Sequence, residues 1–393
     1  MMIRSLHVIP SLSLEHGGPS YAVRAMARAL AKADVDITIA TTDDDGNEAR
    51  LKVPIGEPVK EEQATIYYFR RNIVPYKMSF GLARWLRSNI SRFDIVHIHA
   101  LFSFSSTAAA RMAHWQGVPY IIRPLGVLNR YGLENRRPLL KKISLSLFEL
   151  RILRYSAAIH YTSEAERLEA SGISEAIASH KSVVIPLPIE AAKGDPEDFR
   201  QRFPQVAGRR VILFLSRIDE KKGIELLLDA FAEVRRQISD VVLVVAGSGA
   251  PHYLEKLSQR AKDLGVSGAV VWTGHLDGKI KAGSFAAATM FVLPSHSENF
   301  GVAAAEALSA GLPTIVTESV AISEDIRKYD AGIIAKSNSA ELAVAIHDIL
   351  SRPDLASRLA TNAQRLAIDR YSPGSVGRQL RELYDAILQS RRS

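Results

Sequence analysis

The chain has 393 residues, and 47% of them are hydrophobic and 23% charged, which is typical of a folded globular protein with two domains. It contains no cysteine, so disulfide bonds, cysteine-ligated zinc and a thiol nucleophile are excluded. The net charge of +8 favours an anionic partner, but no nucleic-acid-binding signature accompanies the basic residues, so nucleic acid is not expected.

Short β-branched runs alternate with amphipathic helical patterns along the whole chain, which is typical of βαβ units built around parallel sheets. In the first half, the predicted strands lie within residues 5–12, 35–42, 94–100, 119–126, 157–164 and 182–188. In the second half, they lie within residues 210–218, 241–249, 270–276, 290–295, 313–319 and 331–337. The pattern therefore predicts an α/β protein with two Rossmann-like domains.

The segment 186–210 is rich in proline, glycine and charge, and we place the domain boundary near residue 190 within it. The expected division is a first domain over 1–190, a second domain over 191–375 and a C-terminal amphipathic helix over 376–393. No run of about 18 apolar residues occurs, and the N-terminus has no secretory pattern. A cytoplasmic location is therefore expected.

Two glycines, Gly17 and Gly18, stand between the first predicted strand and the first helix. Such a pair lets backbone N–H groups approach a phosphate at the positive end of a helix, although an ordinary tight turn is the alternative. His97 and His99 alternate with apolar residues, so both should point to one face of a strand. His99 lies nearer the carboxyl end and is a candidate catalytic residue, with a structural role in the core as the alternative.

Basic residues alternate with leucine and isoleucine at helical spacing over residues 136–154. This segment could dock on an anionic membrane surface, where a lipid-linked substrate would be found, or it could be a buried amphipathic helix with a solvated basic side. Its basic residues are Arg136, Arg137, Lys141, Lys142, Arg151 and Arg154.

In the second domain, Arg217 ends a strand and Lys222 precedes a helix. Two cations at the carboxyl end of a parallel strand suit a pyrophosphate, whereas a basic turn paired to Asp219 and Glu220 is the alternative. Gly247 begins a glycine turn after the next strand. The segment 273–283 exposes backbone suited to the edge of a base. For this segment and for the glycine turn, an ordinary loop is the alternative.

Glu298 follows the predicted strand 290–295, and Glu306 lies eight residues later within an alanine-rich helix. Because ligands of open parallel sheets bind outside the carboxyl ends of the strands, both acids are expected at a site. Carboxylates accept hydrogen bonds from the hydroxyl pairs of a sugar and a ribose, and backbone N–H groups of residues 299–302 can hold phosphates between them. A helix-dipole acid and a structural ion pair are the alternative.

These motifs together resemble the retaining GT-B glycosyltransferases of family four, over about residues 3–375. The resemblance rests on "GGPSYAV", "SRIDEKKGIELLLDAF", "VVAGSG" and "PSHSENFGVAAAEALSAGLPTIVT". It implies two Rossmann-like domains facing each other across a cleft, the first binding the acceptor and the second the nucleotide sugar, and a C-terminal helix that crosses back to the first domain.

The resemblance also implies roles for individual residues. The implied contacts are Glu298, Asn299, Phe300 and Gly301 with the sugar, Val302, Arg217 and Lys222 with the diphosphate, Glu306 with the ribose, Gly17, Gly18 and Gly247 around the phosphates, and Leu276 and Lys281 beside the base. Many members carry a histidine after the strand at 119–123, where this chain has Arg123 and then "PLG". A surface-polysaccharide branch of the family is similar at this point.

The sequence therefore predicts retaining transfer of a hexose from a nucleoside diphosphate sugar, with a UDP-sugar preferred, to a glycan or lipid-linked glycan. No cofactor is expected, and no metal, since two cations can stabilise the leaving diphosphate and no Asp-x-Asp motif occurs at the site. Two alternatives remain open, namely a sugar-nucleotide epimerase of the same architecture and a non-catalytic glycan- or lipid-binding protein.

Overall fold

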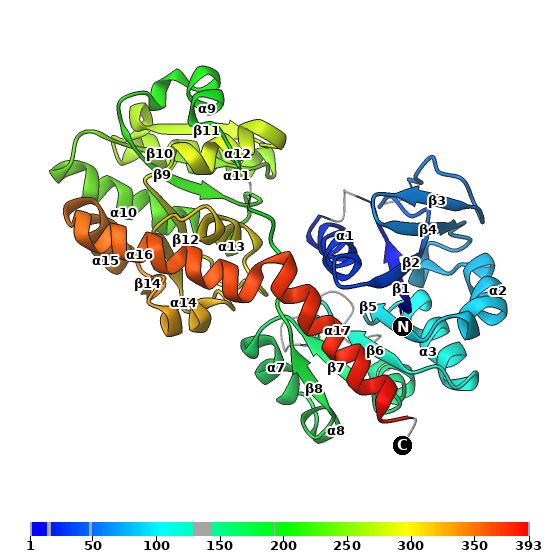
Figure 1. Ribbon diagram of the computed structural model, residues 1–393. Helices are drawn as coiled ribbons and strands as arrows, with labels where there is room; N and C mark the ends of the chain where they lie inside the picture. The colour runs from blue at the N-terminus through cyan, green and yellow to red at the C-terminus, as the bar shows by residue number, and fades with distance from the viewer. Residues whose placement is uncertain (1, 14–16, 47–48, 129–143, 192, 392–393) are drawn as a thin grey trace. The chain divides into compact units, whose positions relative to one another are not determined.

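A computed structural model of the chain describes residues 2–391 except 14–16, 47–48, 129–143 and 192 (Figure 1). The chain forms two compact units, one of residues 1–188 with 373–393 and the other of residues 189–372. The chain returns from the second unit to the first slightly before residue 375, the expected end of the second domain, because the last helix already begins at Pro373. How the two units face each other stays a prediction.

Unit 1 is built on an eight-stranded sheet with the order β3-β4-β2-β1-β5-β6-β7-β8, in which only the β3–β4 pair is antiparallel. Its strands are β1 (Ile3–Ser11), β2 (Val35–Thr42), β3 (Pro58–Glu61), β4 (Ala64–Phe69), β5 (Ile95–His99), β6 (Tyr120–Arg123), β7 (Ala158–Tyr161) and β8 (Ser182–Val184). Its helices are α1 (Gly18–Ala31), α2 (Phe80–Asn89), α3 (Phe104–Trp115), α6 (Leu150–Arg154), α7 (Glu164–Ser171), α8 (Glu175–Ala178) and α17 (Pro373–Gln389).

Helices cover both faces of the unit 1 sheet, because successive side chains of a strand point to opposite faces. Leu6 and Val8 of β1 pack with α2 and α3, whereas Ile3 and Ile9 of the same strand pack with α1 and α17. The C-terminal helix α17 is thus part of the core of unit 1.

Unit 2 is built on a six-stranded, wholly parallel sheet with the order β11-β10-β9-β12-β13-β14. Its strands are β9 (Arg210–Leu215), β10 (Val241–Ala246), β11 (Val270–Gly274), β12 (Met290–Leu293), β13 (Thr314–Thr317) and β14 (Gly332–Ala335). Its helices are α9 (Pro196–Arg202), α10 (Ile224–Gln237), α11 (Pro251–Asp263), α12 (Gly278–Ala287), α13 (Val302–Ser309), α14 (Ser323–Tyr329), α15 (Ser339–Ser351) and α16 (Pro353–Leu366).

The strand order of unit 2 reverses between β9 and β12. From β9 the chain runs outward through β10 to β11, and it then returns to the other side of β9 as β12. In doubly wound sheets, the connections on the two sides of such a switch point diverge, and the crevice outside the carboxyl ends of the two strands binds ligands. A ligand site is therefore expected at the segments that follow β9 and β12.

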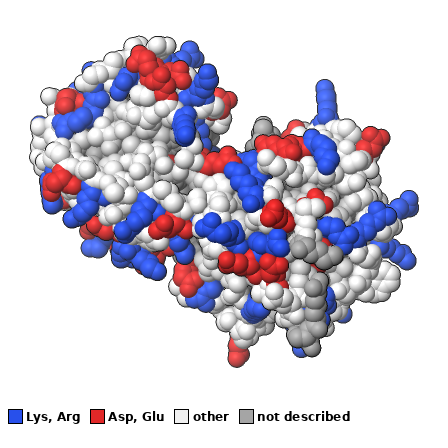
Figure 2. Space-filling view, in the orientation of Figure 1, with Lys and Arg blue, Asp and Glu red and all other residues white. Residues whose placement is uncertain are grey.

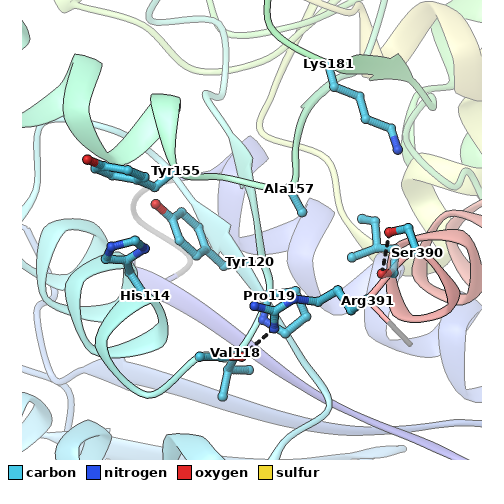
Figure 3. A pocket seen from close by; sticks show the side chains of 11 residues that line it. His114, Val118, Pro119, Tyr120, Tyr155, Ala157, Lys181, Ser390 and Arg391 are labelled. Carbon is cyan, nitrogen blue, oxygen red and sulfur yellow. Dashed lines mark hydrogen bonds between the residues drawn. The ribbon is translucent and has the colours of Figure 1, made fainter. Parts of the chain in front are cut away.

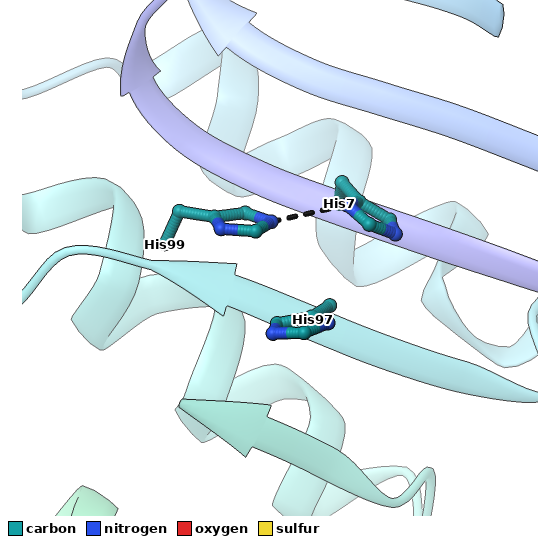
Figure 4. A group of neighbouring side chains, drawn as sticks. All are labelled: His7, His97 and His99. Atoms are coloured by element: carbon teal, nitrogen blue, oxygen red, sulfur yellow. Dashed lines mark hydrogen bonds between the residues drawn. The ribbon is translucent and has the colours of Figure 1, made fainter. Parts of the chain in front are cut away.

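A layer of buried polar side chains joins the unit 1 sheet to α17. The Tyr384 hydroxyl lies 2.8 Å from Nδ1 of His97 and 3.3 Å from Nε2 of His7. His7 also bonds His99 at 3.0 Å, and His160 bonds His97 at 3.2 Å. All five residues are fully buried. Figure 4 shows three of the rings side by side over β1 and β5.

We expect unit 1 to lose stability in acid because this layer must remain neutral. Burial lowers the pKa of His7 and of His160 from 6.5 to about 3, and it lowers the pKa of His97 and of His99 well below 6.5. Below pH 6.5 the unfolded chain therefore binds protons that the folded chain does not. The free energy of unfolding should fall by up to about 1.4 kcal/mol per pH unit for each histidine.

Urea unfolding at pH 7.5, 6.0 and 5.0 checks this expectation by tryptophan fluorescence. In a Trp272→Phe variant, the remaining Trp85 and Trp115 both report on unit 1. The matched variant that retains only Trp272 reports on unit 2, where the midpoint should change less. Equal unfolding midpoints for unit 1 at pH 7.5 and 5.0 would contradict the proposed effect of the histidine layer.

Candidate functional site

The segment after β9 carries the two predicted diphosphate cations. Arg217 is exposed and makes no ion pair with any residue that the structure describes. Lys222 ends the short helical turn η6 (Glu220–Lys222) and is only 8% exposed. The side chain of Asp219 caps this turn by accepting a hydrogen bond from the Lys221 backbone N–H at 3.0 Å. One cation is thus free in solvent, and the other is held within the fold.

An ion pair crosses the switch point between β9 and β12. Nζ of Lys222 donates a hydrogen bond to Oε2 of Glu298, which lies in the loop after β12. The backbone of Glu298 is itself fixed by bonds with Ser319 at 3.1 Å and Ala321 at 3.0 Å. The structure therefore brings together two predicted site residues from segments that follow different strands.

The loop after β12 leads directly into α13. Gly301 precedes the helix with φ 92°, a left-handed conformation that favours glycine. No described side chain caps this N-terminus, so the first backbone N–H groups of α13 remain available to an anion. Asn299 is exposed and Phe300 is buried, its ring packed edge-on against Tyr371 at 5.6 Å. Phe300 therefore anchors the loop, and any contact that it makes with a sugar would come from its backbone.

A second ion pair lies one turn inside the same helix. Oε1 of Glu306 accepts a hydrogen bond from Nζ of Lys281 on α12 at 2.7 Å. Glu306 is 9% exposed, and its neighbours Ala304, Ala305 and Ala307 are fully buried. Leu276, in the loop before α12, is also 9% exposed. The carboxylate of Glu306 is thus oriented before any ligand binds.

Gly247 follows β10 where two backbones meet. A Cβ at this position would lie 1.8 Å from the Ser216 carbonyl oxygen, so only glycine allows the contact. Its N–H donates to the Gly274 carbonyl at 2.8 Å. These contacts give Gly247 a structural role, and its predicted role in donor binding remains untested.

In unit 1, Gly17 and Gly18 are exposed at the start of α1, and Gly17 has φ 62°. They follow β1, as predicted, although residues 14–16 between them and the strand lie outside the described part. His99 is fully buried, its Nε2 bonds His7, and its Nδ1 has no hydrogen-bond partner among the residues described. Such burial favours a structural role, and a catalytic role for His99 stays a prediction.

The loop after β6, where the resemblance led us to look for a histidine, is held by a buried acid that the sequence did not single out. Glu166 accepts hydrogen bonds from the Gly126 N–H at 2.7 Å and from the Thr162 N–H at 2.7 Å. Leu125 has φ 62° in this turn. Arg123 is 3% exposed and contacts Met26, so it is directed into the core. The signal in the sequence was the pair Ser163 and Glu166, spaced as a helix-capping box.

Among the described residues, three histidines form a group that is compact enough to be considered as a metal site. Ring nitrogens of His7, His97 and His99 lie within 4.8 Å of one another. However, the rings of His97 and His99 are stacked, with centroids 4.7 Å apart and planes only 11° apart. An imidazole binds a metal in its own ring plane, and stacked planes do not meet at bonding distance. The group therefore suits mutual hydrogen bonding better than a metal.

A pocket of about 230 Å³ lies at the amino edge of the unit 1 sheet, away from the strand ends discussed above (Figure 3). It is lined by the residues that precede β6, β7 and β8 and by the end of α17, and Arg391 donates to the Gly117 carbonyl there. None of the predicted site residues lines it.

Only part of the basic segment 136–154, for which a membrane surface and a buried amphipathic helix were the two alternatives, lies within the described residues. Arg136, Arg137, Lys141 and Lys142 lie outside the described residues, whereas Arg151 and Arg154 are exposed on α6. On the face shown in Figure 2, basic and acidic side chains are interspersed on both units. Among the described helices, none combines the length and apolar character needed to cross a bilayer.

The chain forms two α/β units whose sheets are mainly parallel, and the second unit carries cations and acids at its switch point. These features are typical of the GT-B class of proteins. The structure of Anabaena HepE in complex with UDP and glucose matches with a TM-score of 0.73 and 18% identity, over 98% of this chain and 100% of that one. This likeness confirms the fold class. Residues 17–188 match the glycosyl transferase 4-like domain and residues 195–366 match glycosyl transferases group 1. The chain belongs to this glycosyltransferase family, as the sequence predicted.

Curated relatives match over part of their length. The GDP-mannose-dependent alpha-(1-6)-phosphatidylinositol monomannoside mannosyltransferase of Mycolicibacterium smegmatis is 28% identical over 51% of this chain and 54% of its own. The alpha-monoglucosyldiacylglycerol synthase of Streptococcus pneumoniae is 30% identical over 53% of this chain and 48% of its own. The chain thus spans about half the length of these relatives.

We expect Gly223→Ala to disrupt the contact between the segments after β9 and β12. Gly223 has φ 65°, and a Cβ there would lie 2.2 Å from the Pro294 carbonyl oxygen. Gly208 has a similar φ of 70° with open space around it, so Gly208→Ala is the matched control. The control should cost about 1–2 kcal/mol from its backbone conformation alone, and Gly223→Ala should cost more. Urea unfolding of unit 2 measures both, and equal losses would contradict the close contact.

Proposed function

We propose that this protein transfers a hexose from a nucleoside diphosphate sugar to a hydroxyl group of a glycan or lipid-linked glycan, with retention at the anomeric carbon. The observation that carries the proposal is the ion pair of Lys222 and Glu298 across the switch point, beside the uncapped N-terminus of α13. Such a site offers positive groups for a diphosphate and an acceptor of hydrogen bonds for sugar hydroxyls.

Charge develops on the diphosphate as the sugar leaves, and preorganised donors stabilise it most at that stage. Arg217, Lys222 and the backbone N–H groups before and within the first turn of α13 supply these donors. In a same-face reaction, the departing diphosphate also takes the proton of the acceptor hydroxyl. Glu298 would orient the sugar by its hydroxyls, and Glu306 would hold the ribose.

We propose that the reaction needs no divalent metal. The two cations and the helix N-terminus already supply positive charge where the diphosphate would lie. The acids at this site also suit hydroxyl groups better than a metal, because Glu298 and Glu306 are each paired with a lysine.

A UDP-sugar is our preferred donor, with GDP-mannose the chief competitor. HepE, by its title, binds UDP and glucose, and the mycobacterial relative is named as GDP-mannose-dependent. The two named curated relatives act on phosphatidylinositol monomannoside or make a glucosyldiacylglycerol. Their names support an acceptor that carries a lipid. Beyond what these names say, we propose a role in polysaccharide or glycolipid synthesis and a location at the cytoplasmic face of a membrane.

The test is a matrix of donors and acceptors in which mass spectrometry detects the product and NMR spectroscopy gives the configuration of the new bond and of the remaining donor sugar. The donors are UDP-glucose, UDP-galactose, UDP-N-acetylglucosamine and GDP-mannose, and the acceptors are mono- and disaccharides, alkyl glycosides, phosphatidylinositol and diacylglycerol. A glycosylated product whose new bond keeps the donor configuration is expected. An epimerised donor without acceptor would instead support the epimerase, and nucleotide binding with no turnover would support a non-catalytic binding protein.

We expect the two acids to have separable effects on ligand affinity. Glu298→Gln should impair transfer while leaving the affinity for the free nucleoside diphosphate nearly intact, because that ligand lacks the sugar. Glu306→Gln should weaken the free diphosphate as well, since the ribose is present and a lost charge-assisted hydrogen bond costs about 1.5–3 kcal/mol. Titration calorimetry with the diphosphate and its sugar conjugate measures both. Equal losses for the free diphosphate would refute this division of roles.

We also expect Arg217→Ala to lower kcat more than it raises the donor KM. The guanidinium acts on charge that grows in the transition state, so the rate should fall on the order of 10²–10³-fold. Arg209, which is likewise exposed in unit 2 but lies at the opposite end of β9, gives the control variant Arg209→Ala. Wild-type turnover by Arg217→Ala would remove this residue from the site.

A further inference from the structure

The buried acid Glu149 hydrogen-bonds to two loops of unit 1, one after β4 and one after β5. Glu149 ends the π-helical turn Leu145–Glu149 and is fully buried. Its Oε1 accepts hydrogen bonds from the Tyr76 hydroxyl at 3.2 Å and from the Phe102 backbone N–H at 3.1 Å. Tyr76 belongs to the segment after β4, and Phe102 to the segment after β5. A third bond, from the Ser144 hydroxyl at 3.1 Å, anchors the carboxyl group locally.

Both loops contain non-glycine residues in the left-handed backbone region. The φ angles are 62° at Tyr76, 50° at Lys77, 89° at Ala100 and 56° at Phe102. Each such residue costs on the order of 1–3 kcal/mol and persists only where the surroundings hold it. Glu149 bonds directly to one strained residue of each loop, and the Tyr76 hydroxyl also lies 3.4 Å from the Thr107 hydroxyl. Glu149 is therefore the buried contact through which both loops are joined, beside this longer one.

The carboxyl group of Glu149 has no counter-charge within the described residues. Its Oε2 is buried and has no hydrogen-bond partner in the part of the chain that the structure describes. Of the titratable groups described there, Tyr76 faces it, whereas Lys77 pairs with Asp44 and Arg151 is exposed. Burial raises the pKa of Glu149 from 4.5 to about 7, and the three hydrogen bonds only partly oppose this effect. The group therefore changes charge in the range where enzymes work.

We propose that Glu149 is a positioning residue on the acceptor side of unit 1, whose neutral carboxyl group holds the loops after β4 and β5 together and whose ionised form releases them. The link to the acceptor rests on the proposed function. The coupling of the two loops does not, because it follows from the contacts of Glu149 alone.

The direction of the effect follows from linkage. Because the closed state has the higher pKa, it binds the proton more tightly than an opened, solvated state does. The closed state is therefore most stable below about pH 4.5 and loses stability as the pH rises through 7. If the opened state restores the ordinary pKa, the equilibrium constant for opening rises about tenfold between pH 6 and pH 8.

Hydrogen–deuterium exchange of the full chain tests the coupling without any ligand. After correction for intrinsic exchange rates, segments 73–80 and 100–107 should exchange up to about tenfold faster at pH 8 than at pH 6. In Glu149→Gln, which cannot ionise, both segments should be equally protected at the two pH values. Glu169→Gln, which alters an exposed acid on α7, is the matched control and should behave like the wild type.

Two results would overturn the proposal. One is equal corrected exchange at pH 6 and pH 8 in the wild type, which decides the matter even if Glu149→Gln fails to fold. The other is an unchanged pH dependence in Glu149→Gln.

A kinetic measurement then tests the role toward the acceptor, with UDP-glucose as donor and the most active acceptor of the panel above. The acceptor KM should rise between pH 6 and pH 8 in the wild type but not in Glu149→Gln, while the donor KM stays equal in both. A change in donor KM alone would overturn the assignment to the acceptor side. If exchange depends on pH but the protein turns over no donor, the proposed function is refuted and the loop coupling still holds.

Discussion

The adjacency of β9 and β12 is the constraint that the candidate site of unit 2 depends on, and the ion pair between Lys222 and Glu298 is its direct result. The two residues are 76 positions apart, and their side chains are only 11% and 21% exposed. Charges so far removed from water are costly unless they are paired. The pair forms because the sheet places β9 beside β12 although two strands separate them in the chain. The contact of Gly223 with Pro294 brings the same two segments together through the backbone, so fold and site share one constraint.

Much of the fold could be predicted because its strands are short, apolar and separated by helical patterns. The edge strand β3 and its neighbour β4 were not predicted, although in β4 the buried positions Ala64 and Ile66 alternate with less buried ones. The site residues of unit 2 could be listed from their places after strands. Their pairing could not, because Lys222 with Glu298 and Lys281 with Glu306 depend on which strands become neighbours.

Buried polar groups of unit 1 were harder to foresee for a related reason. Alternation placed His97 and His99 on one face of a strand, but nothing in the local pattern showed that Tyr384, near the end of the chain, would bond to His97. Glu149 stood out only as an acid within the apolar run "LSLFELRIL". Two of its three hydrogen-bond donors lie 47 and 73 residues away along the chain, a separation at which sequence spacing carries no information.

The two units hold their strand-end loops by different means. Among the described residues, non-glycine positions with positive φ lie in unit 1 with the exception of Asp330, and Tyr76, Lys77, Ala100, Phe102 and Leu125 follow strands. In unit 2, glycines such as Gly223 and Gly301 take the left-handed positions at little cost, and opposite charges fix the loops. In unit 1, the buried acids Glu149 and Glu166 hold strained loops through neutral donors, and the ion pair of Lys77 with Asp44 adds to this in the loop after β4. Such strained residues persist only where their surroundings hold them. Under the proposed function, the loops of unit 2, fixed by glycines and ion pairs, suit binding of the donor, and the strained loops of unit 1 suit binding of the acceptor.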